Sequence, residues 1–121
     1  MTAAVTSPLD RYFRAIDAGD VEATTAAFAD DALYIRPSLE VPGTLETIRG
    51  RHELRAFFTR RGQLPFRHEV RAVAVDGKDC FVEGAAYVED RPTNTFLAHV
   101  TLDDDGLIKR YFALMASSVD E

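Results

Sequence analysis

The 121-residue sequence contains a single cysteine and no long apolar run. Cys80 has no second cysteine with which to form a disulfide, and its apolar neighbours favour a buried, inert thiol. No segment holds the roughly 18 consecutive apolar residues that a membrane span requires. The first eight residues lack the basic start and apolar stretch of a signal peptide, so we expect a cytoplasmic protein without a membrane partner.

Basic residues are outnumbered by acidic ones, 14 to 20, which gives a net charge of −6. This balance argues against general nucleic-acid binding, because neutralising phosphates requires a basic surface. The arginines concentrated between residues 49 and 71 could form a local basic flank for an anionic partner. A solvated helix face and strand edge would explain them as well.

Metal and cofactor motifs are also missing. His52, His68 and His99 are too far apart in sequence to chelate a metal from one helix or strand. The acidic stretch DDDG at 103–106 lacks the remaining ligands of a calcium loop and is better explained as a tight hairpin. The sequence holds no nucleophilic triad, glycine-rich phosphate loop or nucleotide fingerprint. We therefore expect neither a metal nor a cofactor.

Helical patterns begin the chain. Ser7 followed by Pro8 predicts a helix start, and apolar residues then recur at helical spacing. Gly19 suits the left-handed residue that closes a helix, and Asp20 suits the cap that opens the next one. The second helix is expected to end at Asp30–Asp31, so that the two helices form an angled pair.

A short strand at 33–35 should stop at Pro37, because proline cannot donate to a sheet ladder. Residues 38–49 are expected to form a long loop over a pocket mouth. A third helix is predicted from Gly50 to Gly62, with Phe57 on its apolar face.

Four extended runs, FRHEVRAVAV, CFVEGAAYVED, NTFLAHVTL and LIKRYFALMA, complete the chain. The segments DGKD, RPT and DDDG separate them and suit turns, so the runs predict an antiparallel meander. The order of elements predicts a single domain over residues 1–121 with an α+β fold. In it, three N-terminal helices pack on a strongly curved antiparallel sheet that leaves a cone.

Several short motifs together resemble the nuclear transport factor 2-like superfamily, in particular its SnoaL-like and ketosteroid-isomerase-like branches. They are Y12…A18-G19-D20, F28-A29-D30-D31-A32, a proline loop, G50-R51-x-x-L54-x-x-F57-F58 and the closing meander. The resemblance extends from about Pro8 to Ser117. It implies a conical α+β barrel with a mostly apolar small-molecule pocket, a homodimer built through the outer sheet face, and no obligatory cofactor. The activities in the superfamily are too diverse for the fold to choose among them.

The same resemblance can be followed position by position. Tyr12 matches a tyrosine that donates a hydrogen bond to an enolate oxygen in the isomerase. Arg36 falls where that enzyme has its aspartate base, and Ala98 falls where it has a second, protonated acid. Neither replacement can transfer a proton, so steroid isomerisation is not expected.

Strand alternation and the resemblance together divide the strand residues between two faces. They place Val82, Ala86, Val88 and Leu97 on an apolar outer face, where a homodimer would form. The expected ligand-binding residues of the inner face and the third helix are Tyr34, Arg36, Phe57, Tyr87, Ala98, Tyr111 and Met115. A register error of one residue would exchange the faces of a strand.

Three residues are candidates for catalysis. Tyr12 would act with the other tyrosine hydroxyls of the pocket, although these could also be ordinary core residues with satisfied hydroxyls. Glu83 would be a base whose pKa is raised by burial, unless it forms a structural ion pair with Arg36. His68 would be a proton shuttle, or else a surface histidine.

Two functions fit these residues. One is a small-molecule enzyme that performs cofactor-independent acid–base chemistry of the isomerase, dehydratase, cyclase or hydrolase type. The other is a non-catalytic ligand-binding or dimerisation module of the same fold. In both, Tyr12 and Phe57 would lie on opposite sides of one pocket, and Arg36 would meet either Glu83 or an anionic group of a ligand.

Overall fold

The computed structural model describes residues 7–38 and 40–117. Two short helices, α1 (Asp10–Asp17) and α2 (Val21–Ala26), precede the strands β1 (Phe28–Pro37) and β2 (Leu45–Arg49). Helix α3 (Gly50–Arg61) follows. Four longer strands complete the fold: β3 (Arg67–Asp76), β4 (Asp79–Val88), β5 (Arg91–Leu102) and β6 (Ile108–Ser117).

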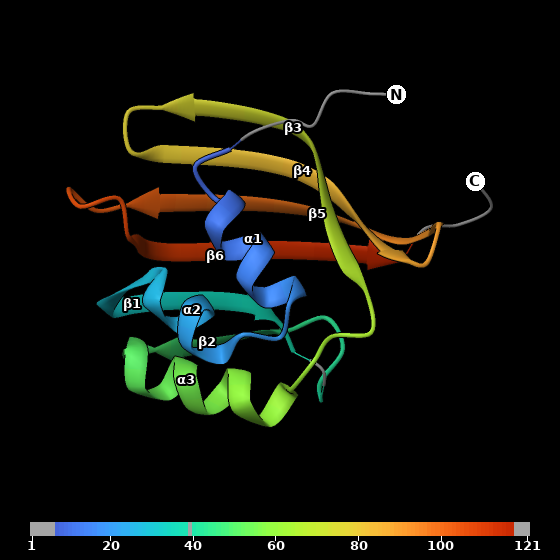
Figure 1. Ribbon diagram of the computed structural model, residues 1–121, viewed down its shortest axis with the longest axis horizontal. Coiled ribbons are helices and arrows are strands. Elements are labelled where there is room, and N and C mark those ends of the chain that lie inside the picture. The colour runs from blue at the N-terminus through green and yellow to red at the C-terminus, as the bar shows by residue number, and fades with distance from the viewer. Residues whose placement is uncertain (1–6, 39, 118–121) are drawn as a thin grey trace.

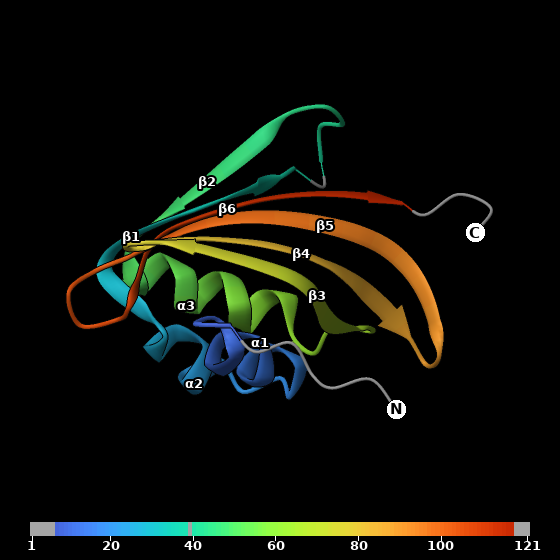
Figure 2. The ribbon, with the colours of Figure 1, turned by 90° about the horizontal axis from the view of Figure 1, so that it is seen from above.

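The six strands form one sheet in the order β2-β1-β6-β5-β4-β3. The strands arch over the three helices, which cover the concave face and leave the convex face uncovered (Figures 1 and 2). The predicted α+β architecture, with helices packed on a strongly curved sheet, is confirmed, and the sheet stays open rather than closing into a barrel. The sheet is mixed rather than purely antiparallel, because β1 pairs with β6 in the parallel direction.

The break between α1 and α2 has the predicted local chemistry. Gly19 has a φ of 71°, a left-handed conformation in which glycine lacks the steric penalty of a side chain. The carboxylate of Asp20 then caps α2 by accepting a hydrogen bond from the backbone N–H of Ala23 at 3.0 Å. At the start of α1, the hydroxyl oxygen of Ser7 accepts the backbone N–H of Leu9 at 3.0 Å.

Three predicted boundaries are wrong. Helix α2 ends at Ala26, and Asp30–Asp31 instead belong to β1, whose first residue pairs with Ile108 of β6. The predicted loop at 38–49 is shorter, because residues from Leu45 onward form β2 against β1. The segment RPT lies within β5, and the chain turns at the two residues before it, where Glu89 has a φ of 56°.

The faces of β1, β5 and β6 follow the prediction, but most of β4 is inverted, and only Val88 at its end is exposed as predicted. Val82 pairs with Ala98 of β5, and both are buried against the helices together with Ala86. Glu83 pairs with Leu97 and is exposed on the convex face. The predicted inward position of Glu83 is therefore wrong, as is the predicted outward position of Val82 and Ala86.

Candidate functional site

A cavity of about 400 Å³ lies on the concave side of the sheet. Residues of α1, the end of α3, the loop that follows it and the inner face of the sheet line this cavity. Among the described residues, its lining includes two arginines and one histidine but no carboxylate. The lining residues are Tyr12, Ile16, Tyr34, Arg36, Pro37, Arg61, Leu64, Phe66, His68, Asn94, Phe96, Tyr111, Ala113, Met115 and Ser117.

Three buried tyrosines meet at one wall of the cavity. The hydroxyl oxygens of Tyr12 and Tyr34 lie 3.4 Å apart, and the ring of Tyr34 stacks on that of Tyr111 with 4.9 Å between centroids. Burial raises the pKa of Tyr12 well above its ordinary value, and the nearby Tyr34 and Tyr111 raise it further, whereas Arg61 opposes the shift. Burial also raises the pKa of Tyr111. Both side chains are therefore neutral hydroxyls at physiological pH and can donate hydrogen bonds.

His68 is held in one orientation by Asp17 of α1. Its ring nitrogen Nδ1 lies 2.6 Å from the carboxylate oxygen Oδ1, and its backbone N–H donates to the other oxygen, Oδ2, at 2.9 Å. The rings of Phe13, Phe66 and Phe96 pack around the imidazole, and its side chain is only 9% exposed. A carboxylate at Nδ1 favours the tautomer with its proton there, which leaves Nε2 as a proton acceptor. Nε2 has no hydrogen-bond partner among the described residues.

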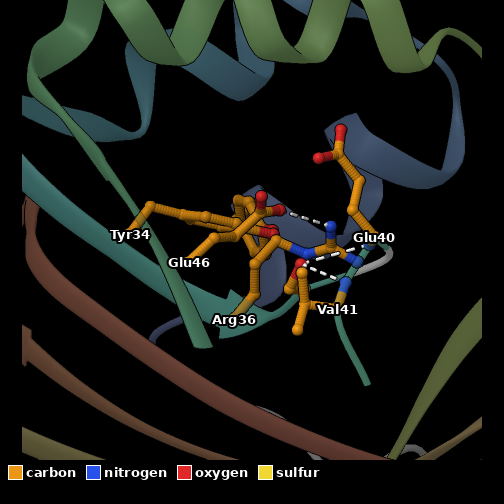
Figure 3. A network of polar contacts seen from close by, with 7 residues as sticks. Tyr34, Arg36, Glu40, Val41 and Glu46 are labelled. Atoms are coloured by element: carbon orange, nitrogen blue, oxygen red, sulfur yellow. Dashed lines mark hydrogen bonds and ion pairs between the residues drawn. The ribbon is translucent and has the colours of Figure 1, made fainter. Parts of the chain in front are cut away.

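Arg36 points into the cavity region but is paired with an acid other than the predicted one. Its Nη1 atom lies 3.0 Å from a carboxylate oxygen of Glu46 on the neighbouring strand β2 (Figure 3). Its guanidinium also lies 5.5 Å from the centroid of the Phe57 ring. The predicted pair between Arg36 and Glu83 is wrong, because Glu83 lies on the opposite face of the sheet.

Arg61, at the end of α3, is a second guanidinium at the cavity. It lies over the rings of Phe57 and Phe58, at 5.0 Å and 5.3 Å from their centroids. Its Nε atom is buried and has no hydrogen-bond partner. In the described part of the chain, Arg61 forms no ion pair.

With this geometry established, the family can be assigned. The family model of the SnoaL-like domain matches residues 9–111. The chain belongs to the SnoaL-like domain family. The resemblance inferred from the short motifs is therefore confirmed.

Solved structures give the same fold. A protein from Kribbella flavida DSM 17836 with the provisional designation ketosteroid isomerase superimposes with a TM-score of 0.70. It is 22% identical, over 94% of this chain and 78% of that one. An NTF-2 like protein of unknown function from Burkholderia xenovorans LB400 gives a TM-score of 0.69 at 23% identity, over 94% and 82% of the two chains. At these identities the likeness concerns the fold alone. No curated protein matches the chain.

Most of the predicted site residues of this SnoaL-like domain lie together. The cavity lining contains Tyr12, Tyr34, Arg36, His68, Tyr111 and Met115. Phe57 lies beside the cavity, in contact with Tyr34 and the two arginines, and Ala98 is buried in the core without lining the cavity.

Tyr87, like Glu83, lies outside the cavity. Its hydroxyl accepts a hydrogen bond from Arg71 at 2.6 Å, and the guanidinium of Arg67 lies 4.7 Å from its ring centroid. The predicted inward position of Tyr87 is therefore wrong, as it is for Glu83 on the same strand.

Sequence reasoning missed Asp17 and Arg61. Helical spacing offered a weak signal for both. Asp17 follows Phe13 by four residues on α1, and Arg61 follows Phe57 by four residues on α3, so each shares a helix face with an aromatic residue of the concave side.

The SnoaL-like domain shows no cluster of three or more metal-ligating side chains within residues 7–38 and 40–117. In the same residues, no helix has the length and apolar character needed to cross a membrane.

Proposed function

We propose that this SnoaL-like domain catalyses cofactor-independent proton transfer on a small carbonyl compound. In this reaction the Nε2 atom of His68 removes a proton from the carbon next to the carbonyl group. The electron pair of that C–H bond moves into the carbon skeleton, and negative charge develops on the carbonyl oxygen. Hydroxyl groups of Tyr12 and Tyr34 donate hydrogen bonds to this oxyanion.

The contact between His68 Nδ1 and Asp17 carries the proposal. It fixes the tautomer in which Nε2 accepts a proton, and it stabilises the imidazolium formed after the transfer. Return of the proton from His68 to another carbon of the enolate system would give an isomerisation. Its transfer to a β-hydroxyl group, which then leaves as water while the electron pair of the enolate forms a carbon–carbon double bond, would give a dehydration. Both reactions begin with the same step, so the arrangement supports either one.

Deuterium exchange tests the step without knowledge of the natural substrate. Small ketones and β-hydroxy ketones are incubated with the protein in D₂O, and loss of the α-proton signal is followed by NMR. We expect His68→Gln and Asp17→Asn to slow the catalysed exchange, and general-base catalysis typically contributes on the order of 10²–10⁴-fold. Glu83→Gln is the matched control, because this exposed carboxylate lies on the convex face and should leave the exchange unchanged.

Equal exchange rates in the wild type and in His68→Gln would contradict the proposal. Ketones that bind in the cavity but show no catalysed loss of the α-proton signal would support the alternative function, a non-catalytic binding module.

We also propose that two copies associate through the convex face. Phe81, Leu97 and Leu114 are 46%, 57% and 46% exposed there, and the ring of Phe81 stacks on His99 at 4.5 Å between centroids. Leu97 and Leu114 are paired across β5 and β6, so the exposed apolar side chains form a continuous surface. A continuous apolar surface of this kind is typical of protein interfaces.

A further inference from the structure

Arg61 lies at a cavity wall with its positive charge uncompensated by any residue that the structure describes. Its Nε is the only buried side-chain nitrogen or oxygen among residues 7–38 and 40–117 that lacks a hydrogen-bond partner. Buried donors in native proteins are nearly always satisfied, so an orphaned one requires a physical reason. Arg61 as a whole is half-buried, and a guanidinium that has lost part of its water without gaining an anion is more costly still.

The two arginines of the cavity differ in this respect. Arg36 has Glu46 as its partner at 3.0 Å, whereas none of the acids that the structure describes lies within ion-pair distance of Arg61. The rings of Phe57 and Phe58 stabilise the Arg61 cation through their faces but cannot accept its N–H bonds in the guanidinium plane. The in-plane donors therefore remain available to an anion.

The rest of the cavity suits a molecule with one anionic group and an apolar body. Within residues 7–38 and 40–117, the lining contains no carboxylate that would repel an anion, and it offers aromatic and aliphatic side chains such as Phe66, Phe96 and Leu64. A carboxylate matches the planar fork of a guanidinium and accepts two parallel hydrogen bonds from it. The cavity volume of about 400 Å³ lies within the range of small-molecule sites.

We propose that the substrate of this cavity is a small organic carboxylate, anchored by Arg61. This inference rests on the proposed function, since it names the class of carbonyl compound on which His68 would act. In this arrangement the carboxylate of the substrate lies at Arg61. The carbonyl group lies closer to the tyrosine hydroxyls, within one cavity.

Binding measurements with matched acids and amides test the proposal. The probes are benzoate, phenylacetate and 3-phenylpropanoate, each compared with its own amide by isothermal titration calorimetry. We expect the best-bound acid to have a Kd about 10- to 100-fold lower than its amide, as charge-assisted hydrogen bonds allow. Arg61→Met should reduce this preference to about one, because only the cationic anchor distinguishes an acid from its amide.

Arg60→Met is the matched control. It removes the same charge from the neighbouring, exposed position of α3, so the acid preference should persist in it. If Arg61→Met does not fold, the wild type and Arg61→Lys decide the question. The wild type should prefer the acids over their amides, and added salt should weaken this preference. Arg61→Lys should retain part of the preference, because lysine keeps the charge but cannot form the bidentate contact.

Equal affinities for acids and amides, failure of all three acids to bind, or an unchanged preference in Arg61→Met would overturn the proposal. The two assays separate this proposal from the catalytic one, because calorimetry reports on the carboxylate anchor and deuterium exchange reports on the proton transfer. An acid preference without catalysed proton exchange would leave the carboxylate site standing and refute the catalytic role. His68-dependent exchange without an acid preference would refute only the carboxylate site.

Discussion

Gly84 of β4 gives a test of how tightly the sheet packs on the wall of the cavity. A methyl group added to Gly84 would lie 2.5 Å from the backbone oxygen of Glu69 and 2.5 Å from Cζ of Phe96. At an unobstructed position, alanine in place of glycine stabilises a protein by about 0.4–1 kcal/mol, because it restricts the unfolded chain. Overpacking at a crowded position instead costs about 1–3 kcal/mol. The contact with Glu69 involves backbone, so the strand itself must shift, and we expect Gly84→Ala to destabilise the fold by about 1–2 kcal/mol.

Urea unfolding followed by circular dichroism measures this change. Adding Phe96→Leu removes the ring atoms from the crowded position but leaves the contact with Glu69. The Gly84→Ala substitution should therefore cost less free energy of unfolding in the Phe96→Leu background than in the wild type. The difference between the two costs is the coupling energy, which measures how much of the destabilisation comes from the Phe96 ring. Phe96 also packs on His68, with 5.5 Å between ring centroids, so Gly84→Ala should slow proton exchange as well. A Gly84→Ala variant as stable as the wild type, or more stable, would refute the packing argument.

Two further predictions concern ionisation and assembly. Because burial raises the pKa of Tyr12 and Tyr111 in the folded state, stability should be lost as pH rises above the unfolded tyrosine pKa of about 10. Denaturation curves of Tyr12→Phe and Tyr111→Phe should show a smaller loss of stability over this pH range. Neither substitution should lower the phenolate absorbance of the folded protein at about pH 10, because the two buried hydroxyls are still protonated there. On the convex face, Leu97→Asp and Leu114→Asp should each convert a dimer into a monomer in light scattering at roughly tens of micromolar protein. Val41→Asp, at an exposed position in the loop between β1 and β2, should not, and a wild type that is monomeric at this concentration would contradict the proposed dimer.

Local chemistry explains which parts of the fold were predictable from the sequence. The break at Gly19 and Asp20 depends on backbone conformation and one capping side chain, and both are properties of the residues themselves. The beginning of β1 was missed because Phe28 continues the helical spacing of α2. Its strand conformation depends on pairing with Ile108, which lies far along the chain.

The faces of β4 could not be deduced from alternation because both faces of this strand are apolar. Val82 and Ala86 are buried against the helices, whereas Phe81 is exposed on the convex face. Only Glu83 distinguished the two sets, and placing it in the cavity assigned Val82 and Ala86 to the wrong face, although Val88 is exposed as predicted. A period of two identifies the buried face only where the other face is polar.

The same distinction between local and long-range information explains which site residues were predicted. Tyr12, Tyr34 and Tyr111 were placed correctly because each lies on an element whose inner face was identified correctly. The partner of His68 is 51 residues away in sequence, on a helix whose position is set by tertiary packing. No local pattern connects Asp17 with His68. The sequence therefore indicated His68 as a candidate site residue but not the carboxylate that orients its ring.

The roles of the cavity residues follow from which charges are paired. Glu46 neutralises Arg36, and Asp17 holds His68, but Arg61 is left to act on whatever enters the cavity. A carboxylate would contact Arg61 both before and during the reaction, so this contact contributes to binding and not to the chemical step. In the proposed reaction the tyrosine hydroxyls would act differently, because they would meet a neutral carbonyl oxygen in the ground state and an oxyanion in the transition state. Under these two proposals a cation would hold the substrate in the cavity, and neutral donors would accelerate the reaction.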